Sequence, residues 1–310
     1  MQGLATRFAA LAATAALLAG CEATKNTPEE ISHLKVAHAN GETIVPPRAE
    51  RVITLAPDAL DTTVALGVSP MAAGLAPRHR GLPRYLGRRV AEAETVGPAS
   101  RPDLDRIRAL DPDLILASRP AQGRIYRRLA DIAPTVTSEA VGHADWELNT
   151  RLHAEALGRQ AAGERLLRDY DHRVARLKRA LGPRRGRVEV SLVRVVPSGV
   201  RVYNLGSYAG SILKDAGVGR PRVQRRPRPF VEVPARDTAR LDGDLILLGR
   251  APGSEAAYRR LVSSPRWQAL RGVRAGRVRR VDDDGWYVGQ GILAARVVMA
   301  DLARLVPPER

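Results

Sequence analysis

Residues 110–116 read LDPDLIL and residues 241–247 read LDGDLIL, so nearly the same heptapeptide occurs in each half of the chain. Each copy has the character of a helix end, followed by a turn of Asp with Pro or Gly and then by a short apolar run. Such a run, bounded by turn residues, is typical of a parallel strand that is buried on both faces. The internal repeat therefore predicts a duplicated α/β architecture.

A second pair of segments supports the duplication. Residues 59–68 (ALDTTVALGV) and 209–218 (AGSILKDAGV) both have the pattern of an amphipathic helix that ends at a Gly-Val pair. Each follows a strand-like run, at residues 51–55 and 188–196. Because strand and helix alternate in both halves, we expect right-handed βαβ units, one parallel sheet per lobe, and two Rossmann-like α/β lobes.

The segment between the two halves, residues 146–181, is helical in pattern almost throughout, with apolar side chains at helical spacing. A helix over residues 161–181 would be about 30 Å long at 1.5 Å per residue. Gly182 and Pro183 end it. One helix of this length can connect two lobes without a flexible hinge.

The N-terminal residues have the features of an export signal. Arg7 and the free amine precede an apolar run at residues 8–18, which has signal-peptide length and is too short to span a bilayer. The run ends in LAGC at residues 18–21, which resembles the bacterial lipobox, where the cysteine is acylated and becomes the mature N-terminus. Cys21 is the only cysteine, so acylation excludes a disulfide. The predicted boundaries are a signal peptide at 1–20, a membrane tether at 21–47, an N-terminal α/β lobe at 48–158, a linking helix at 159–182 and a C-terminal α/β lobe at 183–310.

The chain is strongly basic, with a formal net charge of +17. Clustered basic residues would indicate nucleic-acid binding, but only four of the 50 basic residues are Lys, and the arginines are scattered rather than set in one stripe. A skew of this kind is typical of a GC-rich genome. We therefore expect no nucleic-acid partner, and we expect the surplus of Arg to favour an anionic ligand.

Four stretches together resemble the periplasmic iron-siderophore and cobalamin binding proteins, over residues 51–306. They are RVITLAPDALDTTVALGV at 51–68, VGPASRPDLDRIRALDPDLILAS ending at Ser118, LADIAPTV at 129–136 and SPRWQALRGVRAGRVRRVD at 264–282. The resemblance implies two α/β lobes joined by one long helix, a cleft that binds the ligand, and no catalysis or cofactor. It also implies a monomer that hands a ferric siderophore to an ABC permease with its ATPase.

Ligands of open α/β sheets bind outside the carboxyl ends of the strands, so the loops at 75–80, 118–124, 194–208 and 282–287 are expected to line the cleft. Guanidinium groups can donate hydrogen bonds to the metal-ligating oxygens of an anionic chelate, and aromatic rings can cover its apolar flanks. The candidates are Arg78, Arg119, Arg194, Tyr203, Tyr208 and Trp286. The alternative for each arginine is a solvated surface position. Ala99 replaces an Arg found in some hydroxamate-binding relatives, which weakens a hydroxamate assignment.

Two acidic residues are candidates for docking to the permease. The resemblance implies an acid on the exposed tip of each lobe, and it indicates Asp105 for the first lobe. Alignment of the two heptapeptides places Asp237 near the equivalent position. The alternative for both is a helix N-cap, where a carboxylate is also stabilised.

Other functions have weaker support in the sequence. Residues 289–294 match the dinucleotide pattern GxGxxA, but they follow a polar turn rather than a strand. The six histidines lack metal-ligand spacing, and no nucleophile elbow occurs, so neither a metal site nor an enzyme is expected. Haem or cobalamin binding on the same fold, and a sensory or structural lipoprotein without transport, remain as alternatives.

Overall fold

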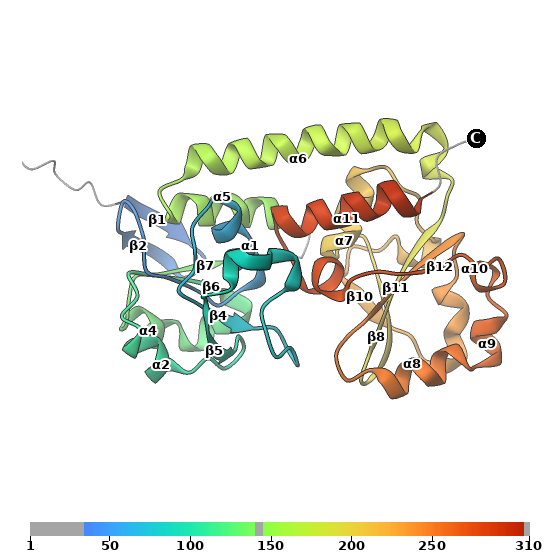
Figure 1. Ribbon diagram of the computed structural model, residues 1–310, viewed down its shortest axis with the longest axis horizontal. Helices are drawn as coiled ribbons and strands as arrows, with labels where there is room; N and C mark the ends of the chain where they lie inside the picture. Colours follow the sequence, from blue (N-terminus) through green and yellow to red (C-terminus); the bar gives the residue numbers. More distant parts are fainter. Residues whose placement is uncertain (1–33, 140–144, 307–310) are drawn as a thin grey trace, which may run out of the picture. The chain divides into compact units, whose positions relative to one another are not determined.

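The computed structural model describes residues 34–139 and 145–306, and within them the chain forms two α/β lobes joined by a long helix (Figure 1). The predicted signal peptide and Cys21 lie outside the described residues. No helix in the described ranges is both long enough and apolar enough to cross a membrane.

The N-terminal lobe contains a five-stranded, fully parallel sheet in the order β5-β4-β3-β6-β7. Its strands are β3 (Val52–Thr54), β4 (Ala72–Leu75), β5 (Glu94–Pro98), β6 (Leu114–Ser118) and β7 (Thr135–Ser138). Its helices are α1 (Pro57–Ala65), α2 (Leu104–Ala109), α3 (Arg119–Gln122), α4 (Tyr126–Ala130) and α5 (Trp146–Ala156), with the 3-10 turns η1 (Arg84–Val90) and η2 (Gly123–Ile125). This lobe has the predicted parallel sheet.

The C-terminal lobe has a five-stranded sheet in the order β10-β9-β8-β11-β12. Its strands are β8 (Val190–Val196), β9 (Gly199–Tyr203), β10 (Phe230–Glu232), β11 (Leu245–Arg250) and β12 (Val278–Arg280). Its helices are α7 (Tyr208–Asp215), α8 (Glu255–Val262), α9 (Pro265–Gln268), α10 (Arg271–Arg274) and α11 (Ile292–Leu305), with the turns η3 (Pro183–Gly186), η4 (Arg222–Gln224), η5 (Ala235–Leu241) and η6 (Asp284–Val288). The expectation of a fully parallel sheet is wrong here, because a tight turn folds β9 back antiparallel to β8, and β10 pairs antiparallel with β9.

The repeated heptapeptides occupy equivalent places in the two lobes. Their apolar halves are β6 and β11, which pair in parallel with β3 and β8 respectively. The second aspartate of each copy accepts a hydrogen bond from the backbone N–H next to the neighbouring strand: Asp113 from Glu50 at 2.8 Å, and Asp244 from Glu189 at 2.9 Å. The repeated Asp therefore fixes the register between two adjacent strands in each lobe.

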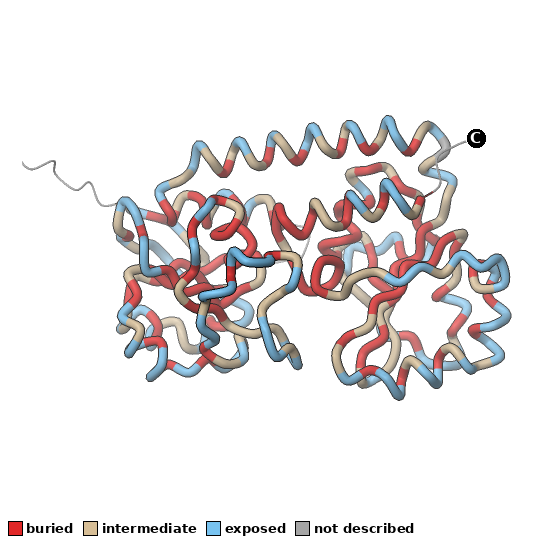
Figure 2. The backbone as a smooth tube through the Cα atoms, viewed as in Figure 1, coloured by how far each residue is buried: buried red, intermediate tan, exposed pale blue. Residues whose placement is uncertain are grey.

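The predicted linking helix is α6 (Gln160–Leu181). Its apolar side chains face the lobes while its other face is exposed (Figure 2). Leu167, Tyr170, Val174 and Leu177 join a core with Trp146, α7 and α11. A stripe of buried residues along one face of a 22-residue helix makes it a stiff connection between the lobes.

The prediction of a tether at 21–47 is wrong for residues 34–45, which are part of the folded lobe. Within it, β1 (Leu34–His38) and β2 (Gly41–Val45) form an antiparallel hairpin. Val36 and Val45 are fully buried in the core of the N-terminal lobe, and the His38 ring is within hydrogen-bonding distance of Thr137 on β7. The segment is polar in composition, so the alternation of buried and exposed residues in this short hairpin does not stand out in the sequence.

Candidate functional site

Loops from both lobes line a cavity of about 230 Å³, called the cleft below. The N-terminal lobe contributes the loop after β4, and the C-terminal lobe contributes the turn after β8, the end of β11 and the turn η6 after β12. These are carboxyl ends of strands, where an open α/β sheet places its ligands. The lining residues are Pro57, Ala76, Pro77, Arg78, His79, Arg194, Val196, Pro197, Ser198, Arg201, Ala251, Tyr287, Val288 and Gln290.

Arg194 is held rigidly at the wall of the cleft. It donates from Nε and Nη2 to the two carboxylate oxygens of Asp283, at 2.8 and 2.5 Å, and from Nη1 to the Tyr203 hydroxyl at 3.3 Å. Its guanidinium also lies 5.5 Å from the centre of the Tyr287 ring. Burial opposes the charged form, but the hydrogen bonds to Asp283 raise the pKa of Arg194 above its usual value. The side chain is 13% exposed, so a charged donor is already oriented before a ligand arrives.

A cluster of charged side chains joins the two lobes at the edge of the cleft. His79 Nε2 lies 3.3 Å from Asp284 Oδ1, and the backbone N–H of Arg84 donates to Asp284 Oδ2 at 3.1 Å. The Arg84 guanidinium pairs with Asp282 at 2.8 Å. The hydrogen bond that His79 donates to Asp284 raises the pKa of His79 against the effect of burial, and the contacts with His79 and Arg84 lower the pKa of Asp284 despite its burial.

A second connection between the lobes is a helix cap supplied across them. Asp61 on α1 accepts hydrogen bonds from the backbone N–H groups of Leu293 and Ala294, at 2.8 and 2.9 Å, in the first turn of α11. Tyr85 donates its hydroxyl to the same carboxylate at 3.0 Å. A Cβ on Gly291 would lie 2.4 Å from Asp61 Oδ1, so glycine is required there. Gly289 and Gly291 of the GxGxxA match are therefore explained by the N-terminus of α11 rather than by dinucleotide binding.

Of the predicted ligand residues, Arg78 and Arg194 line the cleft. Arg78 is exposed and has a left-handed backbone with φ 64°, which directs the loop after β4. Arg119 does not line the cleft; it forms an ion pair with Glu139 at the surface of the N-terminal lobe. Its alternative, a surface position, is what the structure shows.

The three aromatic candidates are buried and do not line the cleft. Trp286 is 1% exposed and donates from Nε1 to Asp301 at 2.8 Å, and Tyr208 is 3% exposed with its hydroxyl on the Gly291 carbonyl. Tyr203 lies behind Arg194 and holds it. The structure does not place these three rings at the surface of the cleft, where they were expected, because each packs into the core of the C-terminal lobe.

His79, Arg201, Tyr287 and Gln290 also line the cleft. All but Gln290 lie within the loops predicted at 75–80, 194–208 and 282–287, although in the last of these the expectation favours Trp286 over Tyr287. In the π-helical turn η6 the two residues have different surroundings. Trp286 bonds to Asp301 on α11, whereas Tyr287 lines the cleft and its buried hydroxyl donates to the carbonyls of Val193 on β8 and Leu247 on β11. The sequence signal for Tyr287 is its position: it is a bulky residue next to Trp286, the predicted site residue.

The two candidate docking acids do not cap helices. Asp103 is the N-cap of α2, accepting from the N–H groups of Asp105 and Arg106, while the Asp105 side chain is almost fully exposed and pairs with Arg108 at 3.0 Å. Asp237 lies inside η5, which has no side-chain cap. The capping alternative is therefore wrong for both acids.

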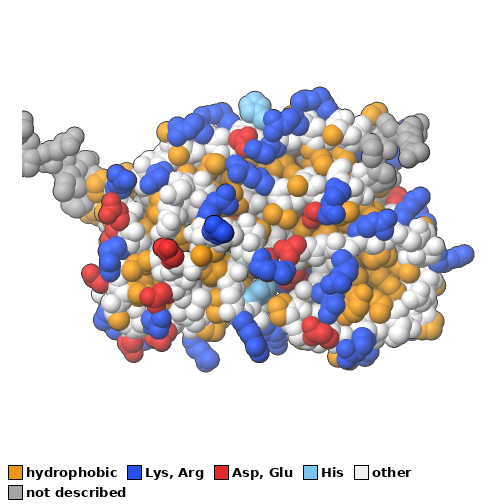
Figure 3. Space-filling view, viewed as in Figure 1, with side chains coloured by type: hydrophobic (Ala, Val, Ile, Leu, Met, Phe, Trp, Pro, Cys, Tyr) orange, Lys and Arg blue, Asp and Glu red, His pale blue; other side chains and the backbone are white. Residues whose placement is uncertain are grey.

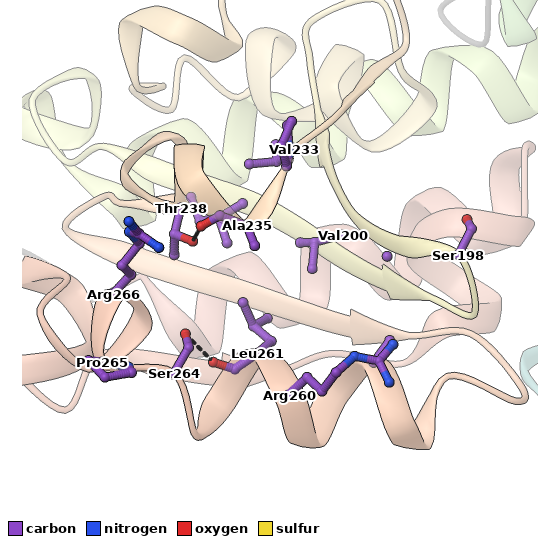
Figure 4. A pocket seen from close by; sticks show the side chains of 14 residues that line it. Ser198, Val200, Val233, Ala235, Thr238, Arg260, Leu261, Ser264, Pro265 and Arg266 are labelled. Carbon is purple, nitrogen blue, oxygen red and sulfur yellow. Dashed lines mark hydrogen bonds between the residues drawn. The ribbon is translucent and has the colours of Figure 1, made fainter.

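A larger cavity, of about 390 Å³, lies in the C-terminal lobe between η5 and α8 (Figure 4). Its wall is mainly apolar, with Val200, Val233 and Leu261 among its residues, and it shares only Ser198 with the cleft. Its position away from the lobe junction makes the cleft the better candidate site. Within residues 34–139 and 145–306, no three His, Cys, Asp or Glu side chains are grouped so as to hold a metal ion.

Known proteins resemble this chain in sequence and in fold. The family model described as periplasmic binding protein matches residues 52–284. A probable siderophore-binding lipoprotein of Bacillus subtilis is 29% identical, covering 92% of this chain and 93% of its own length, and an achromobactin-binding periplasmic protein of Dickeya dadantii is 31% identical, covering 83% and 86%. The crystal structure of Staphylococcus aureus SirA complexed with staphyloferrin B superposes with a TM-score of 0.78 at 26% identity, covering 88% of this chain and 98% of that one.

Proposed function

The chain belongs to the periplasmic binding protein family, and on that premise we propose that it captures a ferric siderophore in the cleft and delivers it to an ABC importer. Relatives named for binding siderophores cover almost the whole chain, which supports this ligand class. The family and these relatives are binding proteins rather than enzymes. The proposal needs no cofactor, since an intact siderophore already fills the coordination sphere of its iron.

The observation that carries the proposal is the set of cationic donors in the cleft. Arg78, Arg194 and Arg201 line it, and no carboxylate is among its lining residues in the described part of the chain. Asp283 and Tyr203 use three of the five N–H groups of Arg194, so one N–H on each terminal nitrogen is left for an anionic chelate. The cavity is smaller than the roughly 300 Å³ at which pockets for drug-sized ligands begin, so the chelate would also occupy the mouth of the cleft.

The same geometry disfavours haem, which needs a Tyr or His as an axial ligand of its iron. Of the side chains of these two types that line the cleft, His79 is bonded to Asp284, and the Tyr287 hydroxyl is bonded to two backbone carbonyls. Either would have to leave its partner to reach iron.

Titration calorimetry of the purified protein tests the ligand class. The titrants are ferric siderophores of the carboxylate, catecholate and hydroxamate classes, with haem and cobalamin alongside. We expect saturable 1:1 binding of at least one ferric siderophore and none of haem. Binding of haem or cobalamin alone would overturn the proposal, as would the absence of any binding.

We further infer that the protein works outside the cytoplasm, anchored through a lipid on Cys21, and that it meets a permease and its ATPase as a monomer. Homologues named as lipoproteins support the location. Cys21→Ala is expected to leave a folded protein that is released or remains as an unacylated precursor. Normal membrane retention of that variant, with incorporated acyl label, would contradict the anchor.

A further inference from the structure

A small cavity at the edge of the C-terminal sheet is ringed by three arginines. It has a volume of about 180 Å³, and we call it the arginine pocket; its lining residues are Val202, Val223, Arg226, Arg228, Val231 and Arg240. Val202 and Val231 face each other across β9 and β10 and form part of an apolar floor. None of these residues lines the cleft.

The pocket concentrates positive charge without compensation. No carboxylate lines it, and none of Arg226, Arg228 and Arg240 forms an ion pair with a described residue. Elsewhere in the described ranges many arginines do pair, including Arg84, Arg194 and Arg201 with neighbouring acids. Three like charges around one small cavity repel each other, so an anion between them would be stabilised.

The loop that carries Arg226 and Arg228 is fixed against the end of β9. Residues 220–229 read RPRVQRRPRP, with five arginines and no acid. Asn204 donates its backbone N–H to Pro229 at 2.9 Å, and a Cβ on Gly206 would lie 1.6 Å from the Pro227 carbonyl. The close approach requires glycine at 206, so the loop is packed firmly against the end of β9 and forms a fixed side of the arginine pocket.

The same segment begins with a buried cation. Arg220 is 3% exposed, and its Nη2 donates at 2.6 Å to both the Tyr203 carbonyl and Gln224 Oε1, while Nε and Nη1 have no protein partner. Gln224 in turn donates toward the carbonyl of Arg240 at 3.5 Å. Burial lowers the pKa of Arg220 to about 10, which still leaves it charged at neutral pH. Arg220 does not line the arginine pocket, but Gln224 links it to Arg240, which does, and its charge adds to the positive charge of the segment at 220–229.

We propose that the arginine pocket binds a phosphate-bearing group, at a site separate from the cleft. Planar guanidinium groups match the oxygens of phosphate in pairs, and three of them match a group with more oxygens than a single carboxylate has. The volume is below the range of pockets for drug-sized ligands, which limits the occupant to a small anion or a headgroup. The phosphate can come from a soluble diphosphate or from the headgroup of a membrane lipid, and the chemistry of recognition is the same.

The test uses the full chain with Cys21→Ala, so that no acyl anchor contributes to lipid binding. Titration calorimetry with inorganic pyrophosphate at low salt is expected to show 1:1 binding that weakens at least ten-fold in the triple variant Arg226→Gln, Arg228→Gln, Arg240→Gln. The control removes the same charge from three exposed arginines without ion pairs among the described residues, Arg127→Gln, Arg128→Gln and Arg274→Gln. We expect the control to stay within two-fold of the parent protein.

Co-sedimentation with vesicles of phosphatidic acid in phosphatidylcholine, against phosphatidylcholine alone, distinguishes the two sources. Pocket-dependent binding of the phosphatidic acid vesicles indicates a headgroup, and pyrophosphate binding without vesicle binding indicates a soluble ligand. Equal losses in the two triple variants, or no binding of either probe, would overturn the proposal. Siderophore binding measured on the same variants is expected to be unchanged, which keeps this result independent of the function proposed for the cleft.

Discussion

Arg194 shows how one side chain is prepared for a ligand. Because both oxygens of Asp283 and the Tyr203 hydroxyl hold the guanidinium, little side-chain freedom is lost on binding. We predict that Arg194→Gln weakens siderophore binding about ten- to a hundred-fold, since a hydrogen bond to a charged group contributes about 1.5–3 kcal/mol. Calorimetry with the ferric siderophore that binds the parent protein measures the change.

The matched control for that variant is Arg119→Gln, which removes an arginine outside the cleft and should leave affinity unchanged. Arg194→Gln alone leaves Asp283 without its partner, so the double variant Arg194→Gln, Asp283→Asn separates lost binding from lost folding. Full affinity in a folded double variant would exclude Arg194 as a ligand residue.

His79 makes the contact between the lobes depend on pH. Its folded-state pKa is raised, so its stabilising contribution is complete below the unfolded value near 6.5 and is lost as pH rises through the folded pKa. Asp284 has a lowered pKa, so its contribution is lost only as pH falls through a value below 3.8. Arg84, Asp282 and Asp283 are the other charged groups around this contact, and Asp282 and Asp284 raise the pKa of Arg84, which stays charged.

We therefore predict that the melting temperature falls between pH 6 and pH 8.5 in the parent protein, and falls less in His79→Gln. Scanning calorimetry at several pH values gives both profiles. Parallel profiles for the two proteins would show that His79 does not stabilise the charged contact.

At the scale of elements, the repeated aspartates explain why the heptapeptide occurs twice. Asp113→Ala and Asp244→Ala each leave a backbone N–H at the neighbouring strand without its acceptor. We predict a loss of about 1–2 kcal/mol in the free energy of unfolding for each, at the lower end for charged hydrogen bonds because both sites are partly exposed. Urea denaturation measures it.

Asp131→Ala, at an exposed carboxylate without a partner among the described residues, serves as the control and should change stability by less than about 0.5 kcal/mol. Losses no larger than this control at both heptapeptides would refute the strand-fixing role.

At the scale of the molecule, the connections between the lobes in the described residues include α6, the Asp61 cap of α11 and the charged cluster around Asp284. Shear or rotation of one lobe against the other would break the cap and the cluster, and a single long helix resists bending. We therefore expect only small movement of the lobes on ligand binding.

Basic side chains are dispersed over the face in Figure 3 rather than gathered in a nucleic-acid groove.

The two docking acids, Asp105 and Asp237, concern the whole molecule, because their predicted role is contact with a permease. Asp105→Arg with Asp237→Arg is predicted to keep siderophore binding and to abolish uptake in cells, since neither acid lines the cleft while a permease would meet repulsion. Asp171→Arg on the exposed face of α6 is the charge-reversal control and should keep both activities. Uptake that survives the double reversal, or binding that falls with it, would reject these positions.

The sequence by itself determined the features that depend on local patterns. Apolar runs bounded by turn residues located β6 and β11, apolar residues at helical spacing located α6, and the repeat indicated two α/β lobes, because each pattern records how its own element is buried. Arg78, after β4, and Arg194, near the carboxyl end of β8, were predictable because parallel strands end at a common edge of their sheet.

Only the tertiary structure decided what depends on contacts between distant segments. The antiparallel β9 follows from a two-residue turn that no apolar period marks, and the choice of Tyr287 over Trp286 follows from one residue of rotation within η6. The sequence also did not determine which acid pairs with each arginine, or that Asp103 rather than Asp105 caps α2. A side chain's direction and its charge partner are set by packing between elements, and sequence spacing carries no record of that packing.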